Sequence, residues 1–207
     1  MADNPMNQIS YGLYVLTANV NGKDNGCIIN TVGQVTSSPN RISFAVNKAN
    51  HTHDMLMQHN QFTVSVISER ADFSLFTRFG FASGRDTDKF ADLAAVKRMA
   101  NGTLAVLEGT NACLSGKVIH TVDLGTHTLF IAEVTEMEIL SDAASATYAY
   151  YHKKIKPQPE KVGETTDGQT IWRCVICGYE YVGEELPEDF ICPLCKHPAS
   201  DFEKVTE

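Results

Sequence analysis

Two C-x-x-C motifs lie close together near the end of the sequence. The first motif is Cys174 with Cys177, the second is Cys192 with Cys195, and 14 residues separate them. Two such motifs can place four thiolates at the corners of a tetrahedron around one metal ion. A disulfide framework is the alternative, but paired C-x-x-C motifs in a cytoplasmic chain favour a metal. We therefore predict that these four cysteines are metal ligands.

The segment that carries the cysteines is too short to fold on a hydrophobic core alone. Residues 170–207 form a module of 38 residues, whereas a core suffices only above roughly 40. Metal binding should therefore supply part of the folding free energy of this module. Four sulfur ligands suit either zinc or iron, and the spacing alone does not separate the two metals.

The composition changes sharply along the chain. The net charge is −8, yet residues 157–207 contain 11 of the 25 acidic residues and only 4 of the 17 basic ones. The sequence KPQPEKVGETTDGQT at residues 156–170 has two prolines, two glycines and almost no apolar side chain. We therefore predict one domain over residues 1–156, a linker over 157–169 and a second domain over 170–207.

Charge and hydropathy exclude several classes of protein. An acidic chain with a pI near 5.3 lacks the basic face that binds nucleic acid. Its apolar runs are far shorter than the ~20 residues that span a bilayer, and MADNPMNQISYG at the N-terminus does not resemble a signal peptide. With 43% hydrophobic residues the chain can build a core. We expect a soluble, cytoplasmic protein that binds neither nucleic acid nor membrane.

The first 155 residues have a mainly β pattern. Stretches rich in β-branched and aromatic residues occur at 11–20, 26–37, 41–46, 61–68, 103–109, 112–125 and 127–140. The pair Asn21-Gly22 is typical of the turn of a β-hairpin. Helical patterns are confined to residues 52–59, 71–80 and 143–153. Many antiparallel strands with a few short helices predict a closed or split barrel.

A polar sequence interrupts this β-rich domain. NTVGQVTSSP (30–39) is followed by a short strand and by NKANHT (47–52), which begins a helix. Amides and hydroxyls in these segments could hydrogen-bond a flavin ring, and Lys48 with the helix N-terminus could hold its phosphate. Turn and capping residues would give the same composition, so both interpretations stay open. The domain has no Rossmann or P-loop glycine motif.

The order of the motifs resembles the FMN-binding split barrels of the flavin reductase-like family. The matching motifs are YGLYVLTA, NTVGQVTSSP, NKANHT, FTVSVI, RFGFASGRDTDKF and GTHTLFIAEV, which together cover nearly all of residues 8–140. The resemblance implies a homodimer that holds one FMN per subunit near the dimer interface.

The resemblance also implies roles for individual residues. The ring and ribityl chain would be lined by Asn30, Thr31, Gln34, Thr36 and Ser37. The phosphate would be surrounded by Asn47, Lys48, His51 and Thr52. His127 would be the catalytic residue, near the flavin face that the nicotinamide of NAD(P)H approaches. The two cysteines of this domain, Cys27 and Cys113, have no partner at motif distance and are predicted to be small buried residues.

The flanks of the C-x-x-C motifs resemble rubredoxin along the whole module. W-x-C-x-x-C-G-Y-x-Y, LPEDF, C-P-x-C and DFE follow in that order, and an aromatic core would come from Trp172, Tyr179, Tyr181, Phe190 and Phe202. Rubredoxin holds one iron and transfers one electron at a time, so the resemblance implies iron. Two departures are a loop shorter than in stand-alone rubredoxins, nearer to that of rubrerythrins, and Lys196 where glycine is frequent. Neither departure removes a ligand.

A flavin barrel joined to a rubredoxin resembles the high-molecular-weight rubredoxins of anaerobic bacteria. That resemblance implies an NAD(P)H-dependent oxidoreductase in which electrons pass from nicotinamide through FMN to the iron and on to a partner protein. The implied partner is a flavodiiron protein that reduces nitric oxide or oxygen. One alternative is a flavin reductase that supplies reduced FMN to a monooxygenase and carries a structural zinc ribbon. Another is a redox-sensing binding module without turnover.

The loop between the two C-x-x-C motifs is strongly acidic. It contains Glu180, Glu184, Glu185, Glu188 and Asp189. Such a cluster is either a solvated face or a surface that steers a protein partner, and we favour steering because an electron carrier needs rapid association.

Overall fold

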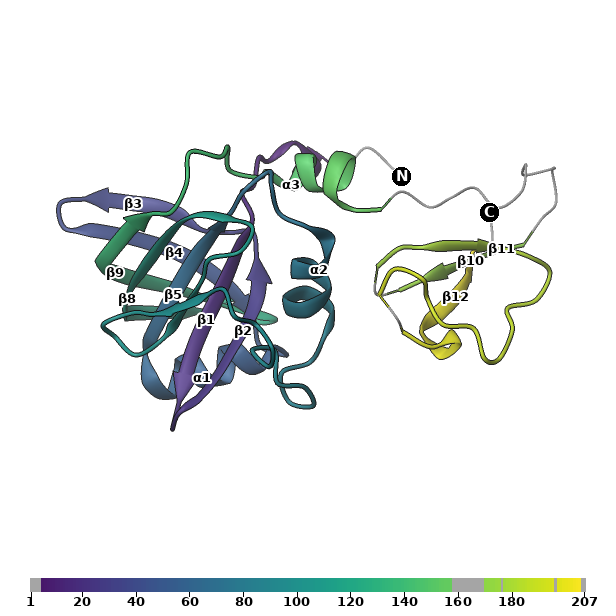
Figure 1. The fold of residues 1–207 in the computed structure, drawn as a ribbon, viewed down its shortest axis with the longest axis horizontal. Coiled ribbons are helices and arrows are strands. Elements are labelled where there is room, and N and C mark those ends of the chain that lie inside the picture. The colour runs from purple at the N-terminus through teal and green to yellow at the C-terminus, as the bar shows by residue number, and fades with distance from the viewer. Residues whose placement is uncertain (1–4, 158–169, 176, 196, 206–207) are drawn as a thin grey trace. The chain divides into compact units, whose positions relative to one another are not determined.

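The computed structural model describes residues 5–157, 170–175, 177–195 and 197–205. The chain divides into two compact units, of which the larger ends at Ile155 and the smaller begins at Lys156 (Figure 1). The predicted linker lies outside the described residues except for Pro157, and so does Lys196.

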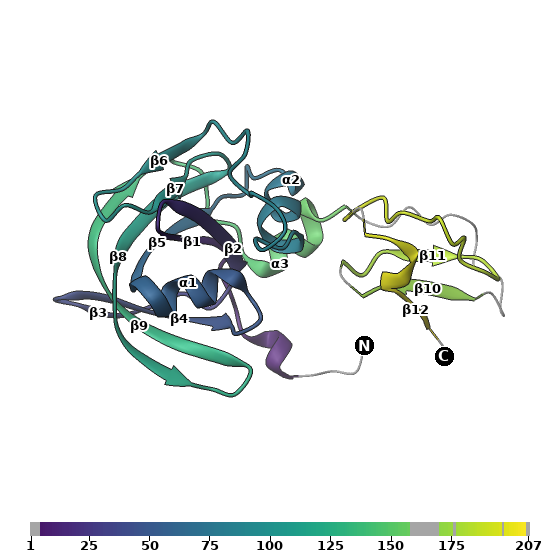
Figure 2. The same cartoon turned by 90° about the horizontal axis from the view of Figure 1, so that it is seen from below.

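The larger unit is built on one antiparallel sheet with the strand order β2-β1-β5-β8-β9-β4-β3. The strands are β1 (Tyr14–Val20), β2 (Lys23–Ile29), β3 (Gly33–Ser37), β4 (Asn40–Asn47), β5 (Gln61–Ile67), β8 (Thr110–Asp123) and β9 (His127–Ile139). A separate pair is formed by β6 (Val96–Arg98) and β7 (Leu104–Val106). The large sheet curls on itself, and α1 (His51–His59) lies across one end of the curl (Figure 2). The mainly β, split-barrel prediction is confirmed.

The turn between β1 and β2 follows directly from two residues. Asn21 and Gly22 have φ angles of 52° and 80°, the left-handed conformation that a two-residue hairpin of this kind requires. The turn sets the pairing of Val20 with Lys23 and hence the register of the whole hairpin. The predicted hairpin is therefore confirmed.

The core of the barrel is aromatic. Phe44, Phe62 and Phe130 are fully buried, and the Phe44 ring lies 5.2 Å from Phe62 and 5.4 Å from Phe130. Met55 and Leu56 of α1 pack into the same cluster. Each such side chain contributes roughly 1.5–3 kcal/mol through burial, so this cluster fixes the position of α1 against the sheet.

A second apolar cluster packs three further helices on the sheet. It joins Leu13, Val15 and Ile67 to α2 (Phe73–Phe76), η2 (Thr77–Phe81) and η3 (Tyr151–Ile155). The helix predicted at 71–80 is confirmed as α2 with η2, and the carboxylate of Asp72 caps it by accepting a 2.8 Å bond from Ser74 N–H.

Two predictions about secondary structure were wrong in part. Residues 26–37 form two strands rather than one, and these lie at opposite edges of the sheet. The helix predicted at 143–153 begins only with α3 (Tyr148–Tyr150). Ser145 and Thr147 are instead paired to strand-like segments through isolated bridges, and the Thr147 hydroxyl then caps α3.

The smaller unit is a three-stranded sheet with an aromatic cluster. Its strands are β10 (Ile171–Cys174), β11 (Glu180–Val182) and β12 (Phe202–Val205), and the short helix η4 (Ala199–Asp201) precedes β12. In the larger unit a short helix, η1 (Pro5–Gln8), precedes β1. Phe190 lies 4.9 Å from the Tyr181 ring and 5.4 Å from Phe202, with Tyr179 at 6.3 Å. These four residues form the predicted aromatic core, while Trp172 pairs with Tyr181 across β10 and β11.

No helix in the described ranges is long and apolar enough to cross a membrane.

Candidate metal centre and flavin site

The four predicted metal ligands come together in the smaller unit. All four cysteines are buried, and their sulfur atoms lie within 4.8 Å of one another. The Sγ of Cys174 is 3.6 Å from that of Cys195, and the Sγ of Cys177 is 3.4 Å from that of Cys192. A disulfide bond is about 2.05 Å long, whereas a tetrahedron with metal–sulfur bonds of about 2.3 Å has edges of about 3.8 Å. The arrangement is a four-cysteine metal site of the rubredoxin type.

Backbone turns hold both motifs in this shape. Gly178 N–H donates to the Cys174 carbonyl, and Cys174 N–H donates to the Tyr179 carbonyl, each at 2.8 Å. Gly178 has a φ of 76°, which glycine adopts without steric strain. In the second motif Cys192 N–H donates to the His197 carbonyl at 2.8 Å. These bonds preorganise the cysteines around one point.

Burial sets the protonation of the ligands. It raises the pKa of Cys177 to about 11 and also raises the pKa of Cys195. Without a cation these thiols would therefore stay protonated at neutral pH, because a buried thiolate needs a compensating charge. A metal ion supplies that charge and releases the protons. The donor set fits iron and zinc equally.

The acidic loop is mostly exposed. Glu180 is engaged, because its Oε1 accepts from Nη2 of Arg173 at 2.8 Å across β10 and β11. The other four carboxylates point to solvent: Glu184, Glu185, Glu188 and Asp189.

The residues predicted to line the flavin ring lie on or before an edge strand. Asn30 and Thr31 follow β2, and the Thr31 hydroxyl donates to the Ala45 carbonyl at 3.1 Å and accepts from Ala45 N–H at 2.9 Å. The other three residues are on β3: Gln34, Thr36 and Ser37. All five residues of β3 are exposed, so this strand offers polar groups on an open surface.

The residues predicted to bind the phosphate surround the beginning of α1. Asn47 ends β4, and its Oδ1 accepts from Ala49 N–H at 2.9 Å. Lys48 follows, and its Nζ lies 2.7 Å from Oδ1 of Asp123. His51 is the first residue of α1. Thr52 is fully buried, and its hydroxyl accepts from Asn25 at 3.0 Å, so this hydroxyl is engaged inside the fold.

His127 lies beside the residues that are predicted to bind the phosphate. It is the first residue of β9 and is the cross-strand partner of Asn47. Its Nδ1 is 2.9 Å from the Thr126 hydroxyl, and the Thr126 carbonyl accepts from Lys48 N–H at 3.0 Å. The turn between β8 and β9 thus holds His127 and Lys48 in one local network.

Two charged residues of this region carry no signal in the sequence pattern. One is Asp123, the partner of Lys48. The other is Arg85, whose Nη1 donates to the Ala49 carbonyl at 2.8 Å although the two residues are 36 positions apart. Arg85 belongs to the motif RFGFASGRDTDKF, but nothing in that motif indicates which part of the chain it meets.

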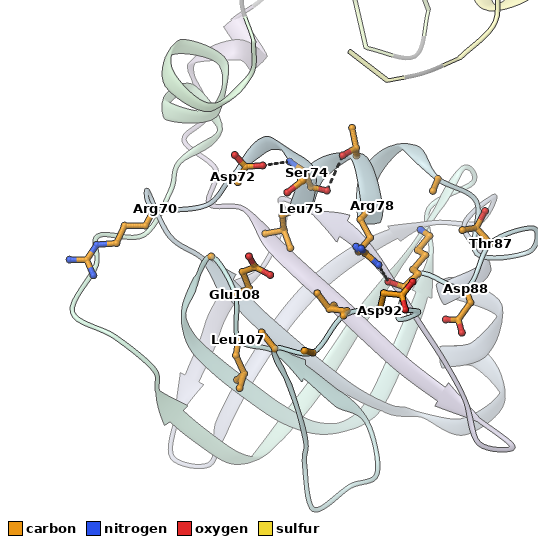
Figure 3. Close-up of a pocket in the computed structure, with 17 residues that line it drawn as sticks. Arg70, Asp72, Ser74, Leu75, Arg78, Thr87, Asp88, Asp92, Leu107 and Glu108 are labelled. Carbon is orange, nitrogen blue, oxygen red and sulfur yellow. Dashed lines mark hydrogen bonds between the residues drawn. The ribbon is translucent and has the colours of Figure 1, made fainter. Parts of the chain in front are cut away.

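A cavity of about 990 Å³ lies elsewhere in the larger unit, beneath α2 and η2 (Figure 3). Arg78 reaches into it and donates to the carbonyls of Lys89 and Ala91 at 3.1 and 2.8 Å. The described residues that line it include none of those predicted for flavin or nicotinamide. Size alone therefore does not make this cavity the flavin site.

Comparison with known proteins agrees with this division of the chain. Residues 6–158 match the family described as flavin reductase like domain, and residues 172–203 match the rubrerythrin, rubredoxin-like domain. The chain belongs to the flavin reductase-like family. It is an oxidoreductase with a rubredoxin-like domain at its C-terminal end, as the sequence motifs predict.

Individual relatives extend this assignment. The chain is 34% identical to the high molecular weight rubredoxin of Moorella thermoacetica, over 97% of this chain and 98% of the relative. It is 40% identical to the ferric-chelate reductase (NAD(P)H) of Archaeoglobus fulgidus, over 70% of this chain and 85% of that protein. The first alignment spans both units.

Among solved structures, flavin reductase HpaC complexed with NADP⁺ has the same fold. It aligns with a TM-score of 0.60 and 20% identity, over 72% of this chain and 93% of HpaC.

Proposed function

We propose that this chain is an NAD(P)H-dependent oxidoreductase that passes electrons through FMN to a rubredoxin-type iron and then to a partner protein. The observation that carries the proposal is the presence of a flavin reductase-like unit and a four-cysteine site on one chain. FMN accepts two electrons at once and releases them singly, which matches a nicotinamide donor to a one-electron metal. The end-to-end alignment with a high molecular weight rubredoxin supports this combination.

The residues at the start of α1 fit the phosphate of FMN. Lys48 supplies a positive charge, and the first N–H groups of α1 add the positive end of a helix dipole. The α1 N-cap, Asn50, makes no side-chain hydrogen bond to these groups. Asn47 and His51 flank this point, and His127, the cross-strand partner of Asn47, would meet the nicotinamide.

The ring would rest against the polar side chains of β3, where Gln34, Thr36 and Ser37 offer amide and hydroxyl groups. Because every residue of β3 is exposed and the strand forms a sheet edge, a ring on this surface remains open to solvent in one chain. A second subunit would cover it, which supports the homodimer implied by the family resemblance.

The four thiolates would hold one iron. Zinc fits the same geometry but has no redox chemistry, so the proposed transfer requires iron. A thiolate site also suits a reducing compartment such as the cytoplasm.

The proposed partner is a flavodiiron protein that reduces nitric oxide or oxygen. The family resemblance supports this choice. The exposed carboxylates Glu184, Glu185 and Glu188 support a partner with a complementary basic surface, because long-range attraction speeds a transient encounter.

The composition of the purified protein tests the proposal. Full-length chain made under iron-replete conditions should contain iron and FMN in equal amounts and be reddish when oxidised. Zinc alone in the four-cysteine site would overturn the electron-transfer function.

The openness of β3 favours one alternative. A flavin held on an exposed strand could exchange, as in a flavin reductase that supplies reduced FMN to a monooxygenase, with zinc as a structural metal. Gel filtration separates the two functions. FMN that stays with iron-loaded protein supports the proposal, whereas freely lost FMN together with zinc supports the alternative.

A further inference from the structure

The connector between η2 and β6, residues 82–95, has no helix or strand, yet buried contacts fix its path. Lys89 is 5% exposed, and its Nζ donates to the Gly26 carbonyl at 2.9 Å and to the Phe79 carbonyl at 3.3 Å. The Phe90 ring packs edge-on against Phe79, with centroids 5.4 Å apart. Burial lowers the pKa of Lys89, and the two carbonyls satisfy its ammonium. The lysine therefore ties the connector to both β2 and η2.

A close approach of Gly84 to the Asn25 side chain on β2 then fixes the connector near the start of α1. A Cβ at Gly84 would lie 2.1 Å from Oδ1 of Asn25, so only glycine permits this contact. Asn25 itself is buried and donates to the Thr52 hydroxyl in the first turn of α1 at 3.0 Å. The residue after Gly84 is thereby directed to the start of that helix.

That residue is Arg85, and its guanidinium reaches residues 47–52, which carry the side chains predicted to bind the phosphate. Nη1 donates to the Ala49 carbonyl at 2.8 Å, and Nη2 donates to Oδ2 of Asp54 at 2.7 Å. These bonds use two of its five N–H donors, and the side chain is 46% exposed. Arg85 is therefore a second cation beside the loop that carries Lys48, oriented by Ala49 and Asp54.

An ion pair with Asp54 does not by itself explain why the fold holds Arg85 in this position. Both side chains are almost half exposed, and exposed ion pairs contribute little to stability. A planar guanidinium with donors to spare is instead suited to bind a phosphate group through two parallel hydrogen bonds.

We propose that Arg85 binds the phosphate of the flavin, and that Lys89 is the buried positioning residue that holds the connector so that Arg85 can do so. The inference rests on the proposed function, because it takes residues 47–52 as the phosphate end of the FMN site. FMN and riboflavin differ by that phosphate, so the two ligands separate a phosphate contact from a general effect on the fold.

The experiment is a titration of flavin-free, full-length chain with FMN and with riboflavin, followed by quenching of flavin fluorescence. Arg85→Ala should raise the Kd for FMN about tenfold or more, as expected for loss of a charge-assisted hydrogen bond, and leave the Kd for riboflavin within about twofold. Lys48→Ala should show the same selectivity. Arg70→Ala is the matched control, since Arg70 is also an exposed arginine paired to a carboxylate, Asp142.

Lys89→Met tests the positioning role. It should weaken FMN binding selectively, and combining it with Arg85→Ala should add little further loss, because both changes remove the same contact. Equal weakening of FMN and riboflavin by Lys89→Met would show a purely structural role for this lysine.

The remaining outcomes separate this inference from the proposed function. If Lys48→Ala weakens FMN binding and Arg85→Ala does not, the assignment of Arg85 is overturned while the flavin site stands. Equal loss of both ligands in Arg85→Ala also overturns it. Tight FMN binding that neither variant affects would show that the phosphate does not bind at α1, which overturns the inference. A wild-type chain that binds no FMN would overturn the proposed function itself.

Discussion

The two units of this chain keep their shape by different means. The larger unit buries fully enclosed aromatic residues such as Phe44, Phe62 and Phe130 inside a curled sheet. In the described part of the smaller unit, the buried residues are Tyr179 and the four cysteines. The larger unit therefore has a fully enclosed apolar core, whereas the smaller one buries its four cysteines beside an aromatic cluster that stays mostly half-buried. In the smaller unit the same four sulfur atoms would therefore serve both folding and the proposed electron transfer, whereas in the larger unit the core and the proposed flavin site use different residues.

Removing the metal should produce the largest effect and should affect one unit only. Trp172 is the sole tryptophan of the chain and lies in β10, so its emission reports on the smaller unit. Metal binding supplies much of the folding free energy of small metal domains, about 10–16 kcal/mol for zinc in zinc-finger peptides, so a chelator should shift Trp172 emission to that of an exposed indole. Far-UV circular dichroism of the barrel should persist. Unchanged emission in metal-free protein would show that the smaller unit has a sufficient core.

Cys177→Ser should also affect one unit only, so that one activity is lost and the other is kept. Electron delivery to a flavodiiron partner should be abolished, because one of the four ligands is lost. Oxidation of NADH with an artificial acceptor should remain within about twofold of wild type, since that step needs only the barrel. Cys113→Ala is the control, because Cys113 is also buried but belongs to the barrel. A loss of flavin reduction by NADH in Cys177→Ser would show that the order of electron flow is different.

Phe44→Ala is the reciprocal change. The ring is fully enclosed between Phe62 and Phe130, so its removal should lower the free energy of unfolding of the barrel by about 3–5 kcal/mol. Below that transition the absorption of the metal site should be unchanged. Met57→Ala, at a half-exposed position of α1, should change stability by less than about 0.5 kcal/mol. A parallel loss of the metal site in Phe44→Ala would mean that the units fold together.

Screening or removing the charges of the acidic loop should give the smallest effect. It should change only the rate at which the chain associates with its partner. Attraction between exposed charges is screened over ~8 Å at physiological ionic strength. The second-order rate should therefore fall several-fold with added salt, while reduction of the flavin by NADH changes little. Replacing Glu184, Glu185 and Glu188 with glutamine should reproduce the salt effect at low salt, and Glu203→Gln on β12 serves as a single-charge control. If neither salt nor these substitutions changed the second-order rate with the partner, the charges would serve solubility alone.

The features that the sequence could predict are those that depend on nearby residues. The four cysteines lie within 22 positions of one another, and the chemistry of thiolates makes the metal site readable from spacing alone. The turn at Asn21-Gly22 is equally local, because its backbone angles belong to those two residue types. In both cases the physical requirement is contained in a short segment.

The features that the sequence could not predict depend on contacts between distant segments. A β-rich pattern at residues 26–37 does not indicate that β2 and β3 separate to opposite sheet edges, since packing of the other strands decides that order. Residues 143–147 have helix-forming alanines, but pairing of Ser145 and Thr147 with distant segments overrides that preference. The approach of Arg85 to Ala49 joins residues 36 positions apart, and the burial of the Lys89 ammonium against the Gly26 and Phe79 carbonyls is equally non-local, so no local pattern indicates either contact.

The most direct test of the central claim is rapid anaerobic mixing of the iron- and FMN-loaded chain with NADH, followed at the flavin and iron absorption bands. The flavin band should bleach first and at a rate that Cys177→Ser does not change, and the iron band should bleach after it in the wild-type chain alone. Reduction of the iron before the flavin, or an iron band that NADH never bleaches, would contradict electron transfer from nicotinamide through the flavin to the four-cysteine site.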